Sequence, residues 1–546
     1  MRKVEQFYKY YQEAVSRFIG LEVSIDYNET QKISIRFKDI PNEILETNKS
    51  KFEQISQIIE ETLLNFYERY NKQPYQPIYK QLLIEELAYQ FIGLQDNKSV
   101  TRNLMEFVEK LKDLCNETYE LESTKMGFII VKDSKINEKE VLKQYNINYY
   151  SLAQNQSLDY FINEKQTLKL IDSKSISLVL NLDYEVIGIA QKKKGYPSIK
   201  DIMLNRYRDQ EERDIKDFTY EYYIKSQFNF GNEREIEKRE EASNRLLLRI
   251  KNEFNVEIEE EISCNIIDLI DGIDMKKLSL KEKVNLREYL LLYTSLQDEL
   301  IQLFNQSKEK YTTVNAFLEE IQQEKNGNSK AFDFVYFDNK QIFWSSSYEN
   351  IIIYSNGRWK LRNYFLLRNI ISRYVMQQYE IEKQVTLNLN YTLEIINDSI
   401  SKIFDLYTSI KSLSDKNIGS LIVILKRNDI SEDDVYSGLL VKGGLSFNKY
   451  NMIIRDERDI PINIVNCDNY LFELVCSVDG AVILDYDLNI NSVGEMIRTV
   501  GLKSEKNYRG SRTLAALSAS KFGLAIKISE DGDILIFEEG HEIARI

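Results

Sequence analysis

Leu474–Asp487, with the sequence LVCSVDGAVILDYD, decides the fold that we expect for the last third of the chain. Apolar residues at helical spacing lead into an Asp-Gly-Ala turn at Asp479–Ala481. The apolar run after this turn predicts a buried strand, which ends at Asp485 and Asp487. Because short carboxylates favour turns, we interpret these last two residues as turn residues rather than metal ligands.

A second motif, Gly510-Ser511-Arg512-Thr513, opens another helix further along the chain. The start of a helix offers backbone N–H groups to phosphate, and an arginine there can pair with it bidentately. In the first motif, Gly480 has no side chain to obstruct a ligand, and the Asp479 carboxylate can hold a metal ion. Together the two motifs predict a nucleotide site.

Composition excludes several functional classes. The chain has 546 residues and a formal net charge of −14, which disfavours general duplex DNA binding. Its four cysteines are widely spaced, and it has neither a signal-peptide pattern nor a long apolar run, so we expect a cytoplasmic protein without a membrane span. The single histidine, His541, cannot build a catalytic triad or a multi-histidine metal site, and we expect it at the surface. Glycine-rich dinucleotide and P-loop motifs are absent from the sequence.

The periodicity predicts an α/β (mixed α+β) protein with three domains. Residues 1–115 read as mainly helical with an early hairpin, and 116–380 as an α/β region with a charged helical insertion. Residues 385–546 read as a mixed sheet flanked by helices, with 438–444 as one short strand. The stretch 178–183 weakly echoes 482–487, which indicates either a degenerate internal duplicate or a coincidence.

The order of elements and motifs in residues 385–546 resembles the diadenylate cyclase domain, and in particular divergent relatives that are sensors or signal synthases of prokaryotic defence systems. The family has Gly-Thr-Arg-His-Arg as its phosphate motif. Residues 510–514 read Gly-Ser-Arg-Thr-Leu, so the first arginine is retained and the histidine and second arginine are not. Where the family continues with Ser-Glu, this chain has Ser520-Lys521.

The resemblance implies metal-dependent catalysis by Asp479 and Arg512, with Asp479 binding Mg²⁺ or Mn²⁺. The nucleotide-binding residues that it implies are Gly480, Ala481, Gly510, Ser511, Arg512, Thr513 and Ser520. The expected substrates are nucleoside triphosphates, joined into a di- or oligonucleotide second messenger of antiviral signalling. The resemblance also implies a homo-oligomer, or a complex with a signal-controlled effector protein.

Two alternatives remain open at this point. The domain could be a catalytically inactive nucleotide sensor that regulates a partner. The absence of the family's histidine and second arginine favours this alternative. It could also be a structural scaffold, in which Asp479 caps a turn and Arg512 makes a salt bridge.

Overall fold

The computed structural model describes a chain that divides into two compact units. One unit consists of residues 1–219 and 327–546, and the other of residues 220–326. The structure describes residues 2–27, 33–72, 75–93, 102–119, 122–132, 137–163, 165–254, 273, 275–322, 332–338, 340–346, 350–379, 389–427, 432–445, 449–455, 460–499 and 510–546.

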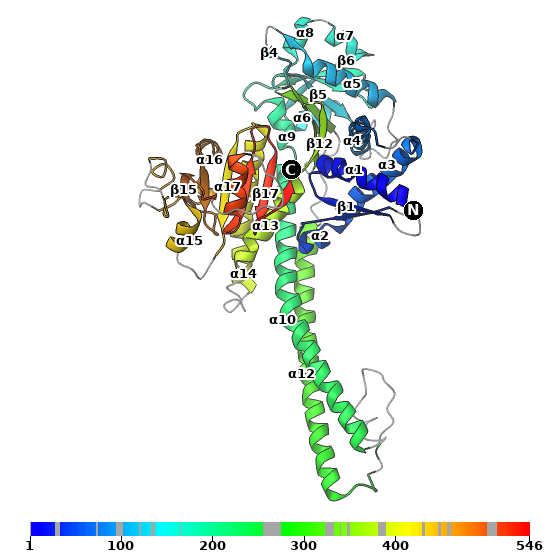
Figure 1. Ribbon diagram of the computed structural model, residues 1–546, viewed down its shortest axis with the longest axis vertical. Coiled ribbons are helices and arrows are strands. Elements are labelled where there is room, and N and C mark those ends of the chain that lie inside the picture. The colour runs from blue at the N-terminus through cyan, green and yellow to red at the C-terminus, as the bar shows by residue number, and fades with distance from the viewer. Residues whose placement is uncertain are drawn as a thin grey trace. The chain divides into compact units, whose positions relative to one another are not determined.

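The first unit begins with helices and one hairpin (Figure 1). The elements are α1 (Arg2–Ile19), β1 (Val23–Tyr27), β2 (Ile33–Phe37), α2 (Asn42–Thr47), α3 (Lys49–Tyr70), α4 (Pro77–Gly93) and α5 (Arg102–Asn116). Val23 pairs with Phe37 in the expected early hairpin. Tyr8 and Tyr11 of α1 are buried and contact the ring of Phe7, so the aromatic start of the chain forms core.

An eight-stranded mixed sheet follows, with the strand order β12-β11-β10-β9-β5-β7-β8-β6. Its strands are β5 (Gly127–Val131), β6 (Ile147–Gln156), β7 (Ile176–Leu180), β8 (Val186–Lys192), β9 (Phe332–Asp338), β10 (Gln341–Ser345), β11 (Asn350–Ser355) and β12 (Arg358–Asn363). A short hairpin and four helices accompany it: β3 (Thr118–Tyr119), β4 (Glu122–Ser123), α6 (Glu138–Gln144), α7 (Leu158–Ile162), α8 (Lys165–Leu170) and α9 (Ile199–Asn205). Asn356 and Gly357 both have positive φ, as the tight turn between β11 and β12 requires.

The last part of the first unit is a six-stranded mixed sheet with the order β15-β14-β13-β16-β17-β18. Its strands are β13 (Ser420–Leu425), β14 (Ala481–Leu484), β15 (Ile490–Glu495), β16 (Gly523–Ile528), β17 (Ile534–Glu538) and β18 (His541–Arg545). The helices are α13 (Tyr364–Tyr379), α14 (Leu389–Asp415), α15 (Glu432–Leu439), α16 (Asn469–Cys476) and α17 (Ser511–Ala519), with a 3₁₀ turn η4 (Ile464–Asn466). The α/β fold class is therefore confirmed.

One strand expectation was wrong. Residues 438–444 form no strand: α15 runs to Leu439, and Leu440 makes only an isolated bridge with Ile497. The apolar face of α15 packs into the sheet core through Val435, Tyr436 and Leu439. A short apolar run before two glycines fits a helix end as well as a strand, and here tertiary packing decides between them.

The two large sheets share one topology. The order β8-β7-β5-β9-β10-β11 corresponds to β15-β14-β13-β16-β17-β18, and each pair of neighbours has the same relative direction in both sheets. The register also corresponds: Phe128 pairs with Leu178 and Val335, as Ile422 pairs with Val482 and Ile526. The connection from β8 to β9 contains the second unit, whereas the described part of the connection from β15 to β16 contains the single helix α17.

The turns that follow β7 and β14 are also alike. Asn181 Oδ1 accepts hydrogen bonds from the backbone N–H groups of Asp183 and Glu185, as Asp485 Oδ1 does from those of Asp487 and Asn489. In each turn the residue before the last has a φ of 62°. The sequence echo between 178–183 and 482–487 therefore coincides with equivalent places in two equivalent sheets.

The helix α13 connects the two sheets and is buried on nearly all sides. Its two arginines are paired: Arg368 lies 3.1 Å from Asp214, and Arg373 contacts Glu538 of β17. Tyr374 donates a hydrogen bond to the carbonyl of Ile424 in β13. Since a buried charge needs a partner, these contacts fix how α13 sits between its neighbours.

The second unit contains most of α10 (Arg208–Phe254) and α12 (Leu280–Gln322). Their contact is a small apolar core of Ile250, Phe254, Ile273, Leu286 and Tyr293. Most other described side chains here are polar, in agreement with the expected charged helical insertion. Among the helices that the structure describes, none is long and apolar enough to cross a membrane.

We expect Arg368→Met to destabilise the protein strongly because it leaves the carboxylate of Asp214 without its buried partner. Removing one member of a buried ion pair typically costs about 3–5 kcal/mol. Arg102→Met is the matched control, since Arg102 is 89% exposed in its pair with Glu106 and such pairs contribute at most about 1 kcal/mol. Urea unfolding measures both variants, and equal losses would contradict the role of α13.

Candidate functional site

The two sequence motifs meet at one edge of the six-stranded sheet, the edge formed by the ends of its central strands. The parallel strands β13 and β14 begin directly after Gly419 and Gly480, so both glycines lie at the same edge. The antiparallel strand β16 ends at this edge and leads to Glu530, and α17 begins there at Ser511. We define Gly419, Asp479, Gly480, the start of α17 and Glu530 as the motif site.

An ion pair joins the two motifs. Arg512 Nη2 lies 3.2 Å from Asp479 Oδ1, and Arg512 Nη1 lies 4.0 Å from Glu530 Oε1. The side chain of Asp479 is 90% exposed and that of Arg512 is 35% exposed. Exposed pairs contribute little to stability, so this pair is available for exchange with a ligand.

Two glycines at this edge lie in close contact with neighbouring groups, Gly480 with backbone and Gly419 with the Arg512 side chain. Gly480 has a φ of 112°, and a Cβ there would lie 2.5 Å from the carbonyl carbon of Gly494 in β15. A Cβ at Gly419 would lie 2.7 Å from Arg512 Nη1. Gly419 therefore leaves the space that the guanidinium occupies, and Gly480 allows the turn before β14 to pack on β15.

The first turn of α17 has no side-chain cap. Its N-cap is Gly510, with a φ of 102°, and this residue has no side chain that could accept a hydrogen bond from the first amides of the helix. These N–H groups and the helix dipole favour an anion at this end. Gly510 and Ser511 are exposed, so a phosphate can reach them.

Lys527 of β16 lies behind the start of α17. Its Nζ donates a hydrogen bond to Thr513 Oγ1 over 3.0 Å, and Thr513 is buried. Burial lowers the pKa of Lys527 below its usual value, and the nearby charges of Arg545 and Arg512 lower it further. Thr513 therefore supports the helix start from inside instead of facing a ligand.

Asp485 and Asp487 lie in the turn between β14 and β15, away from the motif site. Asp485 accepts hydrogen bonds within the turn, and burial raises its pKa. Asp487 Oδ1 accepts hydrogen bonds from Tyr379 Oη at 2.6 Å and Lys402 Nζ at 2.7 Å. Asp487 thus links α13 and α14 to the six-stranded sheet. Its position in a turn of the sequence did not indicate these contacts.

Two further residues lie away from the site. Ser520 is at the other end of α17, about 13 Å along a helix of this length. Its Oγ donates to the carbonyl of Leu517 and accepts from the amide of Gly540, so it is a buried structural residue here. His541 is exposed at the start of β18.

Around the motif site the structure places groups that the sequence did not indicate. Gly494, Glu530 and Lys527 were not assigned to it, because their places on neighbouring strands emerge only from the sheet order. Ala481 is buried at the start of β14, so only its backbone can face a ligand.

A metal ion at Asp479 would have few protein ligands. Among the described residues, no group of three or more His, Cys, Asp or Glu side chains is placed to hold a metal. Mg²⁺ commonly binds one or two carboxylates and takes its other ligands from phosphate and water. One exposed carboxylate beside a phosphate-binding helix start fits that arrangement, and it does not fit a metal held by the protein alone.

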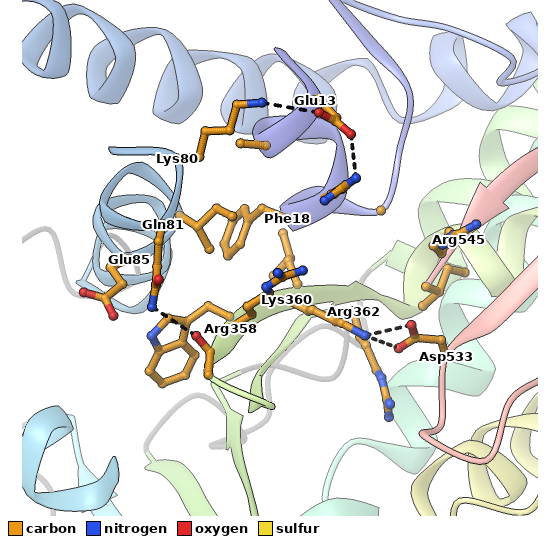
Figure 2. A pocket seen from close by; sticks show the side chains of 18 of the residues that line it. Glu13, Phe18, Lys80, Gln81, Glu85, Arg358, Lys360, Arg362, Asp533 and Arg545 are labelled. Atoms are coloured by element: carbon orange, nitrogen blue, oxygen red, sulfur yellow. Dashed lines mark hydrogen bonds and ion pairs between the residues drawn. The ribbon is translucent and has the colours of Figure 1, made fainter. Parts of the chain in front are cut away.

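Three cavities of the first unit lie elsewhere. Their volumes are about 530, 400 and 860 Å³, and neither Asp479 nor Arg512 lines any of them. The motif site is therefore separate from these three cavities, the first of which is shown in Figure 2.

We expect Gly480→Ala to destabilise the protein more than Gly443→Ala. Both glycines have positive φ, but a Cβ at Gly443 meets nothing within 4 Å. The shared backbone strain is of order 1–3 kcal/mol, so the difference between the two variants reports the clash with Gly494. Thermal unfolding measures it, and equal melting temperatures would show that β15 is not packed on Gly480.

Comparisons with known proteins show no family. No protein-family model matches the chain, and no curated protein matches it. Among solved structures, a double mutant of DacA from Staphylococcus aureus is 19% identical with a TM-score of 0.20, over 27% of this chain and 87% of that chain. A hypothetical membrane spanning protein from Bacillus cereus is 15% identical with a TM-score of 0.20, over 34% of this chain and 93% of that chain.

Proposed function

We propose that the motif site binds a nucleoside triphosphate and uses a divalent metal ion to transfer its nucleotidyl group. The observation that carries the proposal is the convergence of Asp479, Arg512 and the uncapped start of α17 at one sheet edge. This set combines a metal-binding carboxylate, a phosphate-binding cation and backbone donors, which are the parts that phosphoryl and nucleotidyl transfer need.

In this proposal, the ion pair changes partners when the nucleotide arrives. Asp479 would turn to Mg²⁺ or Mn²⁺, and Arg512 would then be free to pair with a phosphate. The bound metal supplies charge neutralisation at the phosphates. Gly419 leaves room for the guanidinium to move, since no side chain occupies that position.

One chain offers one such site. The equivalent sheet has Ser175 just before β7, where Asp479 stands before β14, so that edge has no carboxylate at the equivalent position. Joining two nucleotides would therefore require two copies of the chain, each presenting its own motif site. This requirement agrees with the homo-oligomer that the resemblance to diadenylate cyclases implies.

A second candidate function is nucleotide sensing without turnover. It is favoured by the few carboxylates at the motif site and by the Arg512–Asp479 ion pair, which occupies the carboxylate that catalysis needs. In that case Arg512 would bind phosphate, and the position of α17 would report the bound state.

We expect Arg512→Ala to weaken ATP binding by at least about tenfold, the effect of losing one charge-assisted phosphate contact. Asp479→Asn should keep metal-free ATP binding and abolish turnover with Mg²⁺ or Mn²⁺. Calorimetry measures binding, and mass spectrometry of reactions with each nucleoside triphosphate measures product. Glu539→Gln, an exposed change in the same sheet, is the charge control for Asp479→Asn.

The outcomes separate the two candidates. A metal-dependent product that disappears in Asp479→Asn supports transfer, whereas Arg512-dependent binding without product supports sensing. If no nucleoside triphosphate binds, or if Arg512→Ala does not change its affinity, neither function holds at this site.

A further inference from the structure

A cavity of about 530 Å³ lies between the N-terminal helices and the edge strands of both large sheets. Figure 2 shows its walls: α1 and α4 contribute Phe18 and Gln81, β12 contributes Lys360, and β18 contributes Arg545. The volume is within the range of sites for small molecules, about 300–1,000 Å³.

Cationic side chains outnumber carboxylate side chains in the lining of this cavity, and two of the cations, Arg362 and Arg545, pair with Asp415 and Glu542 outside the lining. The cationic lining residues are Arg17, Lys80, Arg358, Lys360, Arg362 and Arg545, and the carboxylate side chains are Glu13, Glu85 and Asp533. All three of these carboxylates are already paired: Glu13 with Arg17 and Lys80, Glu85 with Lys112, and Asp533 with Lys360.

Two lining residues have unused hydrogen-bond donors. The side chain of Arg358 is exposed and makes no ion pair or hydrogen bond with any residue that the structure describes. Trp359 is 2% exposed, and its buried Nε1–H has no hydrogen-bond partner among the described residues. A buried donor without a partner is rare in folded proteins, and a bound ligand is one way to satisfy it.

We propose that this cavity is a binding site for a small phosphate-bearing molecule. Arg358 would pair with the phosphate, and Lys360 would reinforce it by sharing its charge between Asp533 and the ligand. The indole N–H of Trp359 would donate to another oxygen of the ligand, and Phe18 offers an apolar wall. The site is distinct from the motif site and does not depend on the function proposed there.

One turn connects the cavity with the motif site, so a ligand in the cavity could influence the motif site. The turn from Ser529 to Asp533 faces both places: Asp533 pairs with Lys360 at the cavity, and Glu530 approaches Arg512 at the motif site. The carbonyl of Asp531 accepts a hydrogen bond from Arg362, another lining residue. A ligand that pairs with Lys360 would weaken the ion pair between Lys360 and Asp533, and so would change a contact that this turn makes.

The test uses the full chain with the double substitution Asp479→Ala/Arg512→Ala, so that only the cavity can respond. Calorimetric titrations with inorganic phosphate, pyrophosphate, AMP and ATP distinguish inorganic from nucleotide ligands. We expect at least one of them to bind, and Arg358→Ala to weaken that binding by at least about tenfold. Arg102→Ala, which replaces an exposed arginine outside the cavity lining, should leave it unchanged.

Tryptophan fluorescence locates the bound ligand. The chain has two tryptophans, and Trp344 is buried in the sheet with its Nε1–H donated to Asp333. Ligand addition should change the emission of the double variant, and Trp359→Phe should remove that change. The proposal is overturned if none of the four probes binds up to about 5 mM, if Arg358→Ala binds as well as its parent, or if the emission change persists in Trp359→Phe.

Discussion

The burial of α13 is the constraint on which the arrangement of the first unit depends. Arg368 and Arg373 are almost fully buried, and a charge in such a place is tolerated only with a partner. Asp214 and Glu538 supply those partners from the start of α10 and from β17. Both ion pairs thereby hold residues distant in the sequence to the same helix, α13. These contacts fix the position of the six-stranded sheet, and of the motif site within it, relative to the rest of the unit.

The repeated topology gives the motif site an equivalent position in the eight-stranded sheet, where the residues differ. Both sheets place a turn before an equivalent central strand, but only the six-stranded sheet has Asp479 there. In the other sheet, Ser175 takes that place, and the helix that corresponds to α17 is the short α9, after which the second unit is inserted. The six-stranded sheet thus carries the proposed motif site, while the eight-stranded sheet provides the edge strand β12 that lines the cationic cavity.

The sequence predicted the elements better than their contacts. The early hairpin followed from the alternating pattern and the charged helical insertion from its composition, and the structure contains both. The convergence of Asp479 with Arg512 depended on strand order, which a local pattern does not contain. The interaction of Asp487 with Lys402 was likewise outside local reasoning, because it arises between distant segments. The echo between 178–183 and 482–487 had indicated the equivalence of the two sheets as one of two alternatives.

Hydrogen exchange with and without a non-hydrolysable ATP analogue and Mg²⁺ tests most directly whether the motif site binds a nucleotide. Binding there predicts slower exchange at the amides around Gly480 and at Ser511–Thr513, the groups that would face the phosphates. This protection should persist in Arg358→Ala, whose substitution lies at the cavity. Protection confined to the residues of the cavity, with no change at the start of α17, would contradict nucleotide binding at the motif site.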